Sequence, residues 1–281
     1  MMRFSSRVGA ALFAVFLALC CAAAAEAAEL RGYAGKSGKN TDEGYQYVTF
    51  GRYAYEADGA EAPVLWRVLG KGTPAEDDVI DAANVPDRKW KKTPNGDPEL
   101  EGAEDVYCLM TDAIVDFLLH NETADELGGT ALDYEDSLLY RTLNGEVLER
   151  MFTPEERAAL VFMPDRGYLA PPTRKGELFR ADYGFVAEDF TPWQARRAKG
   201  TPYALSKGLR RIKQGYCWYF TADWRRYGAR WIVGDNGHIS VSGVDREGGI
   251  RPVIYVQADM LEAVGGAGTA EEPLALTAKK P

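Results

Sequence analysis

The stretch "REGGIRPVIYVQ", from Arg246 to Gln257, places an arginine and a proline inside what otherwise has the pattern of a buried strand. Alternate residues of an extended chain face opposite sides, and both sides of this stretch are largely apolar. This pattern predicts a central or covered strand. Because an unpaired buried guanidinium is costly, Arg251 is expected to have a fixed partner there; at a free sheet edge it would point into water.

The residues just before this strand form a predicted hairpin. "RWIVGDNGHISVSG", residues 230–243, has two arms of alternating apolar residues around Asp235-Asn236-Gly237. Asn-Gly suits the positive φ angles of a tight hairpin turn. A two-stranded antiparallel unit is therefore expected here.

The N-terminal half contains a second predicted pair of strands, at residues 45–55 and 62–70. In the second of them, Val64, Trp66 and Val68 fall on one side. Residues 70–105 hold few large apolar side chains, so this stretch is expected to be a long surface excursion. The chain returns to the core at residues 105–110, predicted as a strand that is followed by a helical turn or short helix.

Two helices are expected in the middle of the chain. Residues 135–152 place leucine, valine and methionine side chains at helical spacing. The next helix has a complete start signal, because Thr153 can cap the free amides, Pro154 suits the first helical position and Glu156 completes a capping box.

The first 27 residues have the pattern of an export signal. Arg3 and Arg7 precede an apolar run over 8–25, and residues 25–27 have the small-x-small form of a cleavage site. The alternatives are an uncleaved anchor, or a lipoprotein attached through the cysteines at positions 20 and 21. We expect an exported protein, periplasmic or secreted, with a signal peptide at 1–27, one domain at 28–262 and a flexible tail at 263–281, and with no transmembrane segment once the signal is cleaved.

The charge is unevenly distributed. Residues 28–281 carry a net charge of −10, yet residues 164–230 hold 14 Lys and Arg against 6 Asp and Glu. This basic segment could attract an anionic ligand, or it could lie against the acidic remainder of its own fold. Nucleic acid is not an expected partner of an exported chain with this overall sign.

Cys108 and Cys217 are the two cysteines that remain after cleavage. In an oxidising compartment they are expected to form a disulfide, and burial as two separate thiols is the alternative. His120 and His238 are each isolated in the sequence, so neither a metal site nor a cofactor is expected.

The segment "CWYFTADWRRYGARW", residues 217–231, mixes aromatic and arginine side chains that suit stacking on sugar rings or binding of an anionic group. An alternation into the core of a strand is the alternative for its first residues. The candidate ligand-binding residues are Trp218, Tyr219, Trp224, Arg225, Arg226 and Tyr227.

The order of these motifs resembles the DUF6273 family of exported bacterial proteins, whose function is undefined. "YVTFGRYAYE" with "VLWRVLG", "SLLYRTLNGEVLERMFTPEE", and "GYCWYFTADW" with "GGIRPVIYV" are similar to its opening, helical and closing parts. The closing part also resembles the C-type-lectin-like fold of the formylglycine-generating enzymes. This resemblance implies an α+β domain with twisted antiparallel sheets, two helices and a long loop region, and a structural role for Arg251.

The chain departs from these families in ways that bear on activity. Where DUF6273 has Trp-Trp-Leu-Arg-Ser, this chain has residues 218–222, Trp-Tyr-Phe-Thr-Ala, and it lacks the calcium motifs of sugar-binding lectins. Neither histidine has a recognisable nucleophile beside it, so no catalytic residue is expected. The sequence therefore favours a non-catalytic module of the bacterial envelope that binds a carbohydrate, a cell-wall fragment or another anionic group. An enzyme of unknown reaction and a scaffold for an envelope protein are the alternatives.

Overall fold

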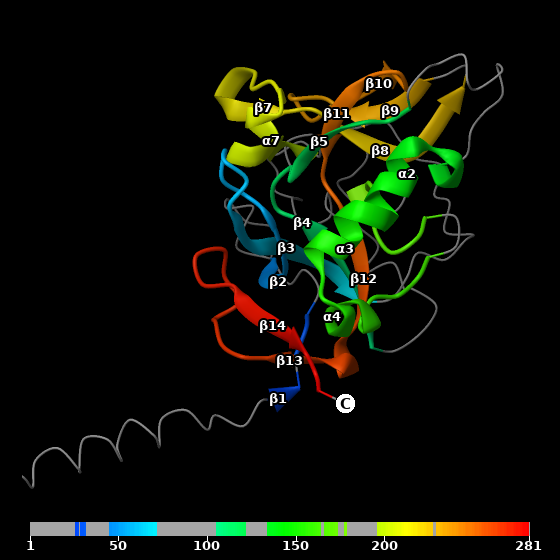
Figure 1. Cartoon of the computed structure of the whole chain (residues 1–281). Helices are drawn as coiled ribbons and strands as arrows, with labels where there is room; N and C mark the ends of the chain where they lie inside the picture. The colour runs from blue at the N-terminus through cyan, green and yellow to red at the C-terminus, as the bar shows by residue number, and fades with distance from the viewer. Residues whose placement is uncertain are drawn as a thin grey trace, which may run out of the picture.

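The structure is a computed structural model, shown in Figure 1. Within it, the predicted signal peptide lies outside the described residues except for Glu26 and Ala27, and the excursion lies outside them from 72 to 104. The described residues are 26–27, 29–31, 45–71, 105–121, 134–163, 166–173, 177–178, 196–226 and 229–280.

The larger sheet of the described chain has seven strands, and the predicted N-terminal strand pair is confirmed within it. Its second and third strands in sequence are antiparallel, and Val64, Trp66 and Val68 are all buried. The strand order is β1 (Glu26–Ala27), β13 (Leu261–Ala263), β14 (Leu274–Ala278), β2 (Gln46–Ala54), β3 (Glu61–Lys71), β4 (Val106–Thr111) and β12 (Val253–Gln257).

A second described sheet has five strands and contains the predicted hairpin. The hairpin is confirmed, because β9 pairs with β10 and the Gly234 N–H donates to the His238 carbonyl at 2.9 Å. Of the Asn-Gly pair only Gly237 takes a positive φ, of 83°. The strand order is β10 (Ile239–Gly243), β9 (Ala229–Val233), β8 (Tyr219–Arg226), β11 (Glu247–Ile250) and β5 (Asp116–Leu119). A two-stranded sheet pairs β6 (Ala198–Lys199) with β7 (Tyr216–Cys217).

The stretch that opened the sequence analysis is two strands rather than one. Its first half is β11 in the five-stranded sheet, its second half is β12 in the seven-stranded sheet, and Arg251-Pro252 connects them. Pro252 has no N–H to give to a ladder, which suits it to the gap between sheets. The connection from β4 to β5 runs antiparallel beside it, with hydrogen bonds from Thr111 N to Pro252 O and from Val115 N to Ile250 O.

The segment after Met110 was predicted to turn into a helix, and that prediction is wrong. Residues 116–119 form β5, which pairs with β11. A short apolar run is compatible with either structure, and the choice depends on a partner strand more than a hundred residues away.

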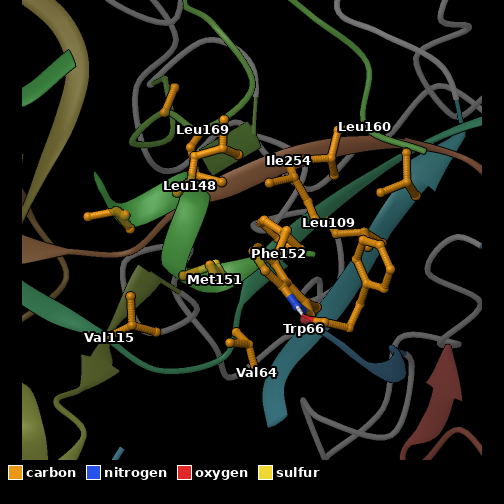
Figure 2. Packing of buried hydrophobic residues seen from close by; sticks show 14 of the residues in the cluster. Val64, Trp66, Leu109, Val115, Leu148, Met151, Phe152, Leu160, Leu169 and Ile254 are labelled. Atoms are coloured by element: carbon orange, nitrogen blue, oxygen red, sulfur yellow. Dashed lines mark hydrogen bonds between the residues drawn. The ribbon is translucent and has the colours of Figure 1, made fainter. Parts of the chain in front are cut away.

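The main core lies between the seven-stranded sheet and the helical segment α2 (Leu138–Thr142), η3 (Leu143–Val147) and α3 (Leu148–Met151) (Figure 2). This helical run confirms the predicted helix, although its middle has π-helical hydrogen bonding. The rings of Trp66 and Phe152 stack with centroids 6.2 Å apart, and Trp66 Nε1 donates to the Phe50 carbonyl at 2.8 Å.

Helix α4 (Pro154–Ala158) begins as predicted. The Thr153 side chain accepts from the Glu156 N–H, and the Glu156 carboxylate accepts from the Thr153 N–H, so the capping box is complete. The remaining short helices of the described chain are η2 (Tyr134–Asp136), α7 (Pro202–Ser206), η4 (Lys213–Gly215) and η5 (Ala258–Met260).

The prediction of a flexible tail from residue 263 is wrong. Residues 274–278 form β14, which pairs in parallel with β2 and antiparallel with β13, and Leu276 is buried. The sequence analysis missed this strand because five residues are too few to show a period, and its neighbours come from distant parts of the chain.

A buried ion pair fixes the loop that covers β12. Arg166 Nη1 lies 2.6 Å from Glu177 Oε1, and this carboxylate also accepts from the hydroxyl of Tyr255 at 2.5 Å and from Thr173 N at 2.8 Å. Burial alone would raise the pKa of Glu177, but Arg166 and these donors lower it to about 2. The carboxylate is therefore ionised, and it ties the loop to β12.

The described chain thus has mixed α+β content, with mostly sheet and few helices. Within the described ranges, none of the helices combines the length and the apolar character needed to span a bilayer.

Candidate ligand-binding site

Arg251 lies where the three sheets meet. Its side chain is fully buried, with 0% of its surface exposed. Nε donates to the Thr111 carbonyl at the end of β4 at 2.9 Å, and Nη1 lies 3.3 Å from the Tyr219 hydroxyl of β8 and 3.4 Å from the Arg196 carbonyl before β6. The guanidinium also lies 5.6 Å from the centroid of the Tyr219 ring. This arginine therefore joins the sheets through carbonyl and hydroxyl groups.

A carboxylate with several cations around it lies beside this junction. Asp112, in the β4–β5 connection, is 2.6 Å from Arg67. Burial alone would raise the pKa of Asp112, but Arg67, Arg251 and Lys199 together hold it below its ordinary value. Lys199 is the exposed member of this group, so the junction reaches the surface at β6.

The first two candidate residues, Trp218 just before β8 and Tyr219 at its start, have different surroundings. Trp218 is half-buried, and its ring packs edge-on against Phe220 with centroids 5.4 Å apart. Tyr219 is fully buried in one core cluster, and the adjacent Phe220 is buried in another cluster. The two side chains face opposite sides of the strand, as successive residues of a strand do. Tyr219 therefore serves the interior, and the expectation that it contacts a surface ligand does not fit its position.

The remaining candidates lie at the far end of β8. Trp224 and Arg226 are in register with Arg230 and Ala229 of β9, but the side chains of Trp224, Arg225 and Arg226 and all of Tyr227 lie outside the described residues. Their role in binding stays a prediction. Arg230, from the same aromatic and basic segment, is buried and donates to the Ala222 carbonyl.

No disulfide joins Cys108 to Cys217 in the structure. Cys108 lies in β4 within one core cluster, and Cys217 lies in β7 within another. The expected disulfide is therefore not formed, because the fold places the two cysteines in different sheets. The alternative, burial as two separate side chains, is the arrangement observed.

His120 is buried against the ring of Phe220, with centroids 5.3 Å apart. Burial lowers its pKa to about 3, Arg230 adds to this effect, and the side chain of Asn121 opposes it. The imidazole is therefore neutral at pH 7. Across the described ranges, no three His, Cys, Asp or Glu side chains are grouped so that they could hold a metal ion.

A partly exposed combination of aromatic and basic side chains occurs at the β6–β7 pair instead, where Lys199 is exposed and Arg197 and Tyr216 are partly buried. Lys199 faces Tyr216 in the strand register. The Arg197 guanidinium lies 5.0 Å from the centroid of the Tyr216 ring, and Lys199 Nζ lies 5.9 Å from it. These distances are those of cation–π contacts, so two cations are held over one half-exposed ring.

The segment of chain that contains this ring has basic residues and no acidic ones. Residues 196–217 contain seven Lys and Arg and no Asp or Glu. Lys207 lies 2.7 Å from Asp116 and is thereby compensated within the fold. Arg210 and Arg211 are exposed, and no carboxylate among the described residues is placed within ion-pair distance of them. The predicted basic segment is thus partly self-compensated and partly presented to solvent.

Arg197, Lys199 and Tyr216 are not among the candidate residues that the sequence pattern predicts. The absence of acidic residues over 190–222 could have indicated them. This stretch is shorter than the predicted basic segment, residues 164–230. The stacking on Tyr216 could not have been found, because it depends on the pairing of β6 with β7 across sixteen intervening residues.

Comparison of the chain with models of protein families, with curated proteins and with solved structures finds no match.

Proposed function

We propose that this protein is an exported, non-catalytic module that binds an acidic carbohydrate of the bacterial envelope, with Arg197, Lys199 and Tyr216 as its binding side chains. The predicted signal peptide supports the location. The resemblance to DUF6273 and to the C-type-lectin-like fold supports a domain that presents a ligand site on loops and short strands. This proposal extends the predicted binding site from β8 to the neighbouring β6–β7 pair.

The observation that carries the proposal is the pair of cations held over the Tyr216 ring. Sugar rings stack their C–H faces on aromatic side chains, and carboxylate or sulfate substituents pair with arginine and lysine. Arg197 is also fixed in place, because its Nη1 donates to Gln214 Oε1 at 3.1 Å. A prearranged cation loses less conformational entropy when it binds an anion.

The proposal is tested with uronic-acid oligosaccharides and with neutral oligosaccharides of the same linkage. A ligand at ten times its Kd stabilises the folded state by about 1.4 kcal/mol, which raises the Tm by about 2–4 °C for a domain of this size. We expect this rise with the acidic series and not with the neutral series. Calorimetric titration then gives the Kd.

Matched variants separate this site from general attraction of acidic sugars to exposed basic side chains. Tyr216→Ala and Lys199→Gln are expected to weaken binding about tenfold, whereas Lys280→Gln, which removes an exposed lysine near the C-terminus, is expected to leave it unchanged. The proposal fails if neither series binds, or if all three variants bind equally well.

A further inference from the structure

The connection between α7 and β7 ends in a well-defined turn. The Ile212 N–H donates to the Tyr216 carbonyl at 3.0 Å, and the Gly215 N–H donates to the Ile212 carbonyl at 3.1 Å. Gln214 and Gly215 take positive φ angles of 63° and 82°. Because the Gln214 side chain accepts from Arg197, the turn is braced against β6. The backbone of the turn is therefore fixed relative to β6 and β7.

The turn exposes an aliphatic side chain between cations. Ile212 is 52% exposed, and the preceding Arg210 and Arg211 are both exposed. Lys213 follows directly in the sequence. Single exposed apolar residues are common on soluble proteins. Here the exposed aliphatic side chain follows two exposed arginines, so this surface can offer an anionic bilayer both cationic and apolar contacts.

The local electrostatics leave this end of the domain positive. Arg210 and Arg211 are exposed on this turn, and no carboxylate among the described residues lies within ion-pair distance of either. A positive surface of this kind is attracted to anionic lipid headgroups, and the attraction falls with added salt.

We infer that the Arg210–Lys213 turn contacts an anionic lipid surface, with Ile212 entering the boundary between headgroups and acyl chains. The exposed Ile212 side chain favours a lipid bilayer over a soluble polyanion as the partner. An acidic glycan offers anions to the arginines but no apolar medium for Ile212, whereas a bilayer offers both. One aliphatic side chain and three cations give a weak, reversible contact.

The test measures binding to sedimented vesicles of phosphatidylcholine alone and of phosphatidylcholine with about one third phosphatidylglycerol. We expect the full chain to bind the anionic vesicles and not to bind the neutral ones. Arg210→Gln is expected to lower the partition coefficient about fivefold, as removal of one cation near a charged bilayer does, and Ile212→Ser to lower it about as much. Phe162→Ser, at an exposed position (54%) outside this turn, is the matched control and is expected to bind normally.

The outcomes separate this inference from the proposed sugar site. Ile212→Ser leaves Arg197, Lys199 and Tyr216 in place, so binding of acidic oligosaccharides is expected to persist in that variant. If Ile212→Ser binds anionic vesicles as well as the unaltered protein does, the attraction is purely ionic and the inference is overturned. The inference is also overturned if the unaltered protein does not bind anionic vesicles, even where it binds the acidic oligosaccharides.

Discussion

Acidification from about pH 7 to about pH 4.5 is expected to destabilise this protein through His120. The side chain is only 1% exposed, and its ring packs edge-on against that of Phe220. Burial, together with the nearby Arg230, lowers its pKa from the ordinary 6.5 to about 3. The folded protein therefore keeps a neutral imidazole at a pH where an unfolded chain takes up a proton.

The sign and size of the effect follow from this difference. Between pH 6.5 and pH 3 the unfolded state binds one proton more than the folded state, so stability is complete above 6.5 and is lost as the pH falls toward 3. Each pKa unit corresponds to about 1.4 kcal/mol, which gives a loss of about 3 kcal/mol at pH 4.5 and about 5 kcal/mol near pH 3. A loss of that size is a large fraction of the stability of most domains.

The assay is urea unfolding, followed by tryptophan fluorescence, at several pH values between about 7 and 4.5. In His120→Gln and His120→Leu the buried group no longer titrates, so the free energy of unfolding should fall less with pH than in the unaltered protein, by about 3 kcal/mol. A constant destabilisation of either variant cancels in this comparison. His238→Gln is the control, because His238 is exposed, and it is expected to keep the full decline.

Carboxylates also begin to titrate near the acidic end of this range, but they do so equally in every variant. Parallel decline of the unaltered protein and both His120 variants would refute the reasoning. It would mean that the imidazole is protonated in the folded state or reaches solvent there.

Two further predictions concern the interior. Arg251→Met keeps the apolar stem but removes the donors to Thr111 and Tyr219, so the free energy of unfolding should fall by about 2–4 kcal/mol. The surface change Arg210→Met should lower it by less than about 0.5 kcal/mol. Equal unfolding midpoints in urea for the two variants would argue against a structural role of Arg251 between the sheets. Gly51→Ala adds a Cβ that would lie 2.6 Å from the ring of Phe152 at a φ of 68°, whereas at Gly59, with a φ of 88°, a Cβ would meet nothing within 4 Å. Thermal unfolding should therefore show a loss of at least about 2 kcal/mol for Gly51→Ala and only about 1 kcal/mol for Gly59→Ala, and similar losses for the two would contradict the contact with Phe152.

Much of the local structure could be predicted because its causes are local. The capping box at Thr153, the Asn-Gly turn at Gly237 and the apolar alternation at Trp66 each depend on residues within a few positions of one another. The burial of an arginine at position 251 was also suggested by its apolar neighbours. The candidate site was harder to predict, because Tyr216 becomes a platform for two cations only when β6 and β7 pair.

The sequence by itself determined the early strand pair, the hairpin around Gly237, the start of α4 and which segment is basic, because backbone preference, capping and charge belong to short stretches. Only the tertiary structure decided that residues 246–257 divide between two sheets and that residues 274–278 join the larger sheet beside β2. It also decided which tyrosines face solvent and that the two cysteines lie in separate clusters. These outcomes depend on contacts between residues far apart in the chain. The free energy of burying those contacts selects the arrangement, and a short stretch of sequence does not contain it.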